Sequence, residues 1–165
     1  VFRYCLVTNV AQRLKEQGVK LDTSQCVWVE NICRESISKR WPHMDFSSAT
    51  TANYAFFWAQ CHTIDLITAN ENCTWVGAFG TANQLVNITF DGTIGKSIDF
   101  SASPLSVDSM KSVIAHLKNY IGSDSALANR VKFTDACWAA LEADGSAPDG
   151  NTWRDYVETT LGWLT

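Results

Sequence analysis

The chain has 165 residues, of which 46% are hydrophobic and 18% are charged, and its formal net charge is −4. This composition supports a hydrophobic core and excludes an intrinsically disordered chain. An acidic chain without a basic stripe binds phosphate backbones poorly, and no apolar run approaches the roughly 18 residues that a membrane helix needs. We therefore expect a single domain spanning residues 1–165, a monomer with no nucleic-acid or membrane partner.

The cysteine content predicts an oxidising compartment. The number of cysteines is even, and none lies in a C-x-x-C pair or at zinc-finger spacing. We expect about three disulfides, in a pairing that the sequence does not choose, and the alternative is a set of buried free thiols. The chain starts with Val1 rather than Met, which favours a processed, secreted form. The six cysteines are Cys5, Cys26, Cys33, Cys61, Cys73 and Cys137.

Two glycosylation sequons agree with secretion. They are Asn72-Cys73-Thr74 and Asn87-Ile88-Thr89. Asn72 stands beside a predicted half-cystine, which hinders its use. We therefore expect Asn87 to be the better acceptor.

The N-terminal part predicts two helices and contains no internal repeat that we detect. Residues 7–18 have a capping residue, an apolar face and a terminal glycine. Residues 24–39 place apolar side chains at helical intervals. In such a helix Cys26 and Cys33 lie two turns apart, too far to bond to each other, so each would bond to another element.

The central part predicts β-strands at 54–67, 73–79, 84–90 and 93–100. The first has apolar side chains on both faces, which indicates a strand covered on both sides, with a buried helix as the alternative. The last two favour a hairpin whose loop ends at Gly92 in the left-handed conformation. That register points Asn87 toward solvent.

The C-terminal part predicts three helices. Ser103-Pro104 begins the first, which ends at Gly122, Thr134 caps the second, and Thr152 caps the third. The predicted fold class is therefore α+β. It consists of an antiparallel sheet of about four strands with helices packed on it, stapled by about three disulfides.

Candidate catalytic groups are few. The chain has no nucleophile elbow, no H-E-x-x-H, no P-loop and no dinucleotide fingerprint. His62 could act as a base beside Asp65 or Asp99, although a hydrogen-bonded structural histidine is the simpler interpretation. The alternative to a binding protein is a small secreted hydrolase, ribonuclease-like, that uses His43, His62 or His116 with a lysine. We expect no catalytic residue, no metal and no cofactor.

Aromatic residues are the candidates for a binding surface. Trp41 and Trp153-Arg154 lie beside predicted loops, and tryptophan and arginine carry much of the binding energy at protein interfaces. The alternative is ordinary packing of a terminal helix. A small-ligand carrier with an aromatic cavity under residues 54–79 is a third interpretation.

The size, the cysteines, the order of sheet and helices and the missing catalytic motifs resemble a family of small effectors from plant-pathogenic fungi. These are the Leptosphaeria avirulence and suppressing effectors, which have relatives in the tomato leaf-mould fungus. Of the family's Trp-Arg-apolar-Arg motif this chain has Trp153-Arg154, followed by Asp155-Tyr156. The resemblance implies secretion into the host apoplast. It also implies a non-catalytic virulence role through a host plant protein, and recognition by, or masking from, an immune receptor.

Overall fold

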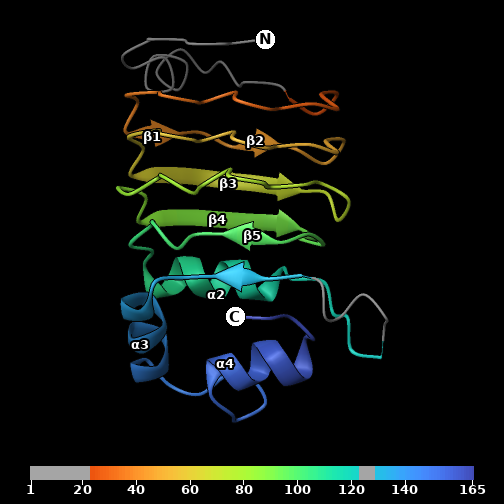
Figure 1. The fold of residues 1–165 in the computed structure, drawn as a ribbon, viewed down its shortest axis with the longest axis vertical. Helices are drawn as coiled ribbons and strands as arrows, with labels where there is room; N and C mark the ends of the chain where they lie inside the picture. The colour runs from red at the N-terminus through yellow and green to blue at the C-terminus, as the bar shows by residue number, and fades with distance from the viewer. Residues whose placement is uncertain (1–22, 123–128) are drawn as a thin grey trace.

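The computed structural model describes residues 23–122 and 129–165 as a stack of coils closed at one end by helices (Figure 1). The main sheet is parallel throughout. Its central strand, β3 (Thr63–Ala69), pairs on one side with β1 (Arg40–Trp41) and β2 (Met44–Asp45), and on the other with β4 (Asn87–Gly92). A second pair, β5 (Ile98–Asp99) and β6 (Val131–Lys132), is parallel as well.

Each coil advances the chain by about 23 residues. Arg40 pairs with Thr63, and a line of isolated bridges joins Trp28, Thr51 and Thr74. Consecutive parallel strands need a return path between them, so each coil consists of a strand and a return segment. The result is a β-solenoid, in which each coil packs on the coil before and after it.

The interior of the solenoid is filled by ladders of side chains from equivalent positions. In β4 only Ile88 and Phe90 point inward, following the alternation of a strand. Four phenylalanine rings, one from each successive level, stack along the return side with centroid distances of 5.2, 4.6 and 6.0 Å. They are Phe56, Phe79, Phe100 and Phe133.

Helix α2 (Val107–Ala115) takes the place of the next strand and covers the edge of β4. The hydroxyl oxygens of Ser109 and Ser112, one helical turn apart, accept hydrogen bonds from the backbone N–H groups of Ile88 and Phe90. Such an edge otherwise invites pairing with another chain. The remaining elements complete this end: α3 (Asp135–Ala143), α4 (Trp153–Asp155) and the π-helix η1 (Tyr156–Thr160).

The predicted antiparallel sheet with disulfides is wrong. The strands are parallel, and no disulfide joins any two of the five cysteines within residues 23–122 and 129–165. The stacking explains this, because Cys33 and Phe56 occupy equivalent positions in neighbouring coils. Cys137 approaches backbone carbonyls rather than sulfur. Cys5 and the predicted helix at 7–18 lie outside the described residues.

Two other elements differ from the prediction. Residues 24–39 form turns and bends, because their apolar spacing fits one return segment of a coil as well as a helix. The predicted hairpin at Gly92 does not form: β4 pairs with β3 instead, and Ile94 bridges to Leu117 in the next coil. Gly92 nevertheless has the predicted left-handed backbone, with φ of +75°.

The C-terminal helices are predicted more accurately. Thr134 and Thr152 cap α3 and α4, and each side chain accepts a hydrogen bond from the backbone N–H three residues later. Helix α2 begins slightly later than predicted, because Ser106 rather than Ser103 is its N-cap.

Candidate functional site

Four side chains on the return segments form an exposed cluster, which we call the aromatic patch: Arg34, Tyr54, Phe57 and Trp58. The rings of Tyr54 and Phe57 meet edge to face at 5.5 Å, and those of Phe57 and Trp58 lie 4.9 Å apart. The guanidinium of Arg34 lies over both Phe57 and Trp58, at 5.4 and 6.0 Å from the ring centroids. Tyr54 is 41% exposed and Trp58 56% exposed, so the cluster faces solvent.

The coil geometry dictates where these aromatic residues sit. The position occupied by Asn31, Tyr54 and Gly77 in successive coils is left-handed each time, with φ between 54° and 62°. Asparagine and glycine tolerate this conformation, whereas for a tyrosine it is strained. Glu35 and Trp58 occupy a second left-handed position four residues later, with φ of 56° for each.

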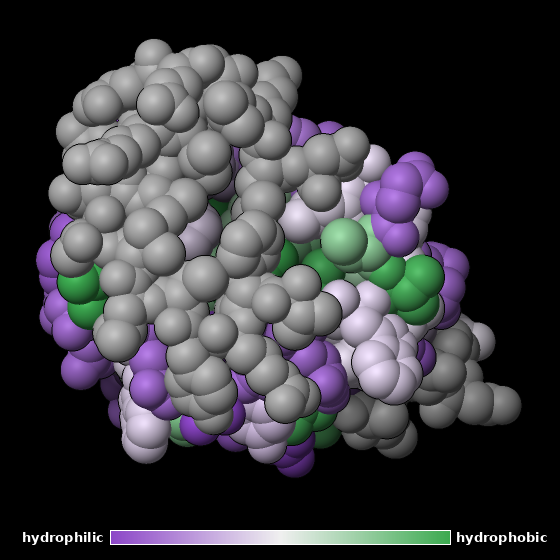
Figure 2. Space-filling model, turned by 90° about the horizontal axis from the view of Figure 1, so that it is seen from above, coloured by the Kyte–Doolittle hydropathy of each residue, from purple (hydrophilic) through white to green (hydrophobic). Residues whose placement is uncertain are grey.

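The neighbouring coil fits the patch closely. A Cβ atom on Gly77 would lie 2.6 Å from Cε1 of Tyr54, so the tyrosine ring rests directly on the glycine backbone. The backbone N–H of Trp58 donates to the hydroxyl of Thr81 at 2.6 Å. The rings are therefore held in place by the coil beneath them. Seen along the solenoid axis, apolar side chains reach the surface between hydrophilic ones (Figure 2).

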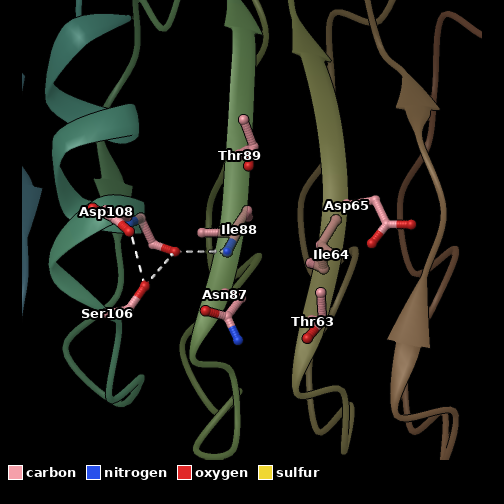
Figure 3. Close-up of a pocket in the computed structure, with 9 residues that line it drawn as sticks. Thr63, Ile64, Asp65, Asn87, Ile88, Thr89, Ser106 and Asp108 are labelled. Carbon is pink, nitrogen blue, oxygen red and sulfur yellow. Dashed lines mark hydrogen bonds between the residues drawn. The ribbon is translucent and has the colours of Figure 1, made fainter.

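A second feature lies where the sheet meets α2, and we call it the sheet-end pocket (Figure 3). Its volume is about 230 Å³. Two of its lining residues, Ile64 and Ile88, are apolar and buried, and the others carry hydroxyl, amide or carboxylate groups. The lining consists of Thr63, Ile64, Asp65, Asn87, Ile88, Thr89, Ser106, Asp108 and Ser109.

The predicted binding residues are mostly packed inside the molecule. Trp41 and Trp153 are buried, and the indole N–H of Trp153 donates to the carbonyl of Gly145. Arg154 is exposed, but its guanidinium lies over the ring of Trp138 and forms an ion pair with Asp135. These three residues therefore do not form one exposed surface.

The structure does not bring the three histidines together. His43 contacts the hydroxyl of Thr68, and His116 contacts the carbonyl of Ser112. His62, which is exposed just before β3, approaches only Thr63, at 3.5 Å. Within the described ranges no hydrogen bond joins a histidine to a carboxylate or to a lysine, as a general base with an orienting partner would require.

Two of the predicted half-cystines are buried thiols. Burial raises the pKa of Cys61 and that of Cys73 to about 12, so both stay protonated at neutral pH. Among residues 23–122 and 129–165 no group of three or more His, Cys, Asp or Glu side chains could hold a metal ion.

The two sequon asparagines are both exposed, as expected for Asn87. Asn87 begins β4 and lines the sheet-end pocket, together with Thr89 of the same sequon. Asn72 lies in a turn, where its backbone N–H donates to the side chain of Asn70. Their glycosylation stays a prediction.

The sequence analysis missed the aromatic patch because it assigned Tyr54, Phe57 and Trp58 to a strand buried on both faces. The signal that could have located them is the repeat itself. Ala55-Phe56 and Ala78-Phe79 are 23 residues apart, which aligns Tyr54 with Gly77 and marks it as a left-handed position.

Comparison with known proteins gives no relative: no protein family, no curated protein and no solved structure matches the chain. None of the helices in the described part of the chain has the length and apolar character needed to cross a bilayer.

Proposed function

We propose that this chain is a non-catalytic binding protein that engages a protein partner through the aromatic patch. The observation that carries the proposal is the left-handed backbone of two exposed aromatic residues, Tyr54 and Trp58. A non-glycine residue in this conformation costs about 1–2 kcal/mol, and aromatic side chains gain nothing from solvent exposure. Strained residues of this kind cluster at functional sites.

The composition of the patch supports a protein ligand. Tryptophan, tyrosine and arginine are the residues most enriched among the dominant contributors to protein interfaces. Arg34 stacks on Phe57 and forms an ion pair with Glu35, so its guanidinium is already oriented before a partner arrives. Tyr54 is similarly held on Gly77. Side chains that are already fixed lose less conformational entropy on binding.

The prediction of a secreted fungal effector depended largely on disulfides, and the described residues form none. Its secretion, host partner and immune recognition stay untested predictions, and we carry forward the non-catalytic binding function alone. The ribonuclease-like alternative is not supported, since the three histidines lack partners for general acid–base catalysis.

Affinity capture with three forms of the protein tests the proposal. The source material is extract or fluid from the setting in which the protein occurs, and the forms are wild type, Trp58→Ala and Trp28→Ala. Trp28 is 75% exposed but makes no ring contact with the patch, so it is a matched control. A partner captured by wild type and Trp28→Ala, and lost with Trp58→Ala, supports the proposal. Identical captures with all three forms contradict it.

A further inference from the structure

The sheet-end pocket has a lining that suits one class of ligand. Its outer residues offer oxygen acceptors from β3, β4 and the start of α2, and its lining contains no lysine, arginine or histidine (Figure 3). Ile64 and Ile88 supply an apolar floor. A ligand that fits this lining needs hydrogen-bond donors at its tip and an aliphatic stem behind them.

The two carboxylates of the pocket differ in their neighbours. Asp65 forms an ion pair with Arg40 through Oδ1, at 2.7 Å from Nη2, so its charge is compensated. Asp108 is exposed and forms no ion pair within residues 23–122 and 129–165. The pocket therefore carries one uncompensated negative charge at its α2 side.

The start of α2 is closed to an anionic ligand. Ser106 caps the helix: its hydroxyl oxygen accepts from the backbone N–H of Ser109 at 3.3 Å, and its carbonyl accepts from that of Met110 at 3.0 Å. These N–H groups would otherwise attract an anion. With them satisfied and Asp108 beside them, the pocket selects a cation.

We infer that the sheet-end pocket binds the primary ammonium group of a lysine side chain from a partner polypeptide. An ammonium group donates three hydrogen bonds and accepts none, which matches acceptors from Asp108, Asn87 and Thr89. Its four-carbon stem can lie on the apolar floor while the charge stays near water. This inference does not depend on the aromatic patch, which is built from other segments of the coil.

A titration followed by backbone amide NMR signals tests the inference. The probe is Nα-acetyl-lysine N-methylamide, and its Nε-acetylated form, with the same stem and no charge, is the control. We expect the lysine probe to shift the signals of Asn87, Thr89 and Asp108, and the acetylated probe to leave them in place.

Two variants assign the charge. Asp108→Asn keeps the size of the side chain and should weaken lysine binding about tenfold. Asp155→Asn alters another exposed carboxylate in the first turn of a helix and should leave the affinity unchanged. Trp58→Ala should also leave it unchanged, which separates this inference from the proposed function.

Three results would overturn the inference. They are equal binding of the acetylated probe, an unchanged affinity in Asp108→Asn, and an absence of shifts up to high millimolar probe. A methyl glucoside that shifts the same signals in place of the lysine probe would instead identify the pocket as a polyol site.

Discussion

The hydroxyl oxygen of Ser109 accepts a hydrogen bond from the backbone N–H of Ile88 at 2.8 Å, and this contact closes the last strand of the sheet. Ile88 is buried, so its N–H group has no access to water if the serine is removed. A helix thus satisfies a strand edge through side chains spaced one turn apart.

Replacing Ser109 by alanine should therefore destabilise the protein. An unsatisfied buried N–H costs about 1–3 kcal/mol, and Ser109→Ala should lower the free energy of unfolding by that amount in urea titrations. The exposed Ser48 provides the control, since Ser48→Ala should change stability by less than about 0.5 kcal/mol. Equal stabilities of the two variants would contradict the capping role.

Strain at the aromatic patch can be measured by comparing two substitutions of Trp58. Trp58→Ala and Trp58→Asn both remove the ring, but asparagine tolerates the left-handed backbone better than alanine does. We expect the asparagine variant to be more stable by about 1 kcal/mol in thermal or urea unfolding. Both variants should lose partner binding equally, because binding depends on the ring. An alanine variant as stable as the asparagine variant would show that the backbone there is unstrained.

Gly92 and Gly122 have nearly the same φ, +75° and +76°, but different surroundings. A Cβ atom on Gly92 would lie 2.3 Å from the carbonyl oxygen of Ala69, whereas one on Gly122 has nothing within 4 Å. Gly122→Ala should cost only the backbone strain, about 1 kcal/mol. Gly92→Ala should cost clearly more, about 3 kcal/mol or above, because β3 and β4 must separate. Circular dichroism melts of the two variants compare them directly.

The buried thiols predict a loss of stability at high pH. Burial holds the pKa of Cys61 and that of Cys73 at about 12, against 9.0 for an exposed thiol. Above pH 9 the unfolded chain loses these protons while the folded chain keeps them, so the free energy of unfolding falls as the pH rises toward 12. Cys61→Ala or Cys73→Ala should flatten this fall in urea titrations between pH 8 and 11.

The same thiols allow a direct count. In the folded protein at pH 8, Cys61 and Cys73 should not react with a thiol reagent. After denaturation without reductant, at least five cysteines should react, since the described residues contain no disulfide. Fewer reactive thiols would contradict the parallel solenoid and revive the predicted disulfides.

Helix ends were predictable because their signals are local. Thr134 and Thr152 each accept a hydrogen bond from a backbone N–H three residues later, and a capping residue followed by an apolar stripe is enough to indicate this. Gly92 was predicted in its observed conformation for a similar reason, since its backbone depends on few neighbours.

Sheet direction was not predictable from the same local patterns. The alternation of Ile88 and Phe90 indicates an inward face, but it is the same for parallel and antiparallel neighbours. The repeat of 23 residues would have decided the matter. It is hidden because its interior positions differ in size: Cys33, Phe56 and Phe79 occupy one ladder.

The candidate site was harder still, because Tyr54 and Trp58 contradict the local preference of their own positions. Sequence patterns report what a backbone favours, and a residue that departs from it becomes visible only once the coil is known. The sheet-end pocket joins β3, β4 and α2, so no single stretch of sequence could indicate it.

The 23-residue spacing gives the molecule a modular length. Removing residues 51–73 takes out one whole level and joins Thr50 to Thr74, the pair already linked by a backbone hydrogen bond across that level. The shortened stack would be lower by about 4.8 Å, one strand spacing, with the terminal helices unchanged. Duplication of the same unit would lengthen it by an equal step, so chains of this design can vary in height without a new fold.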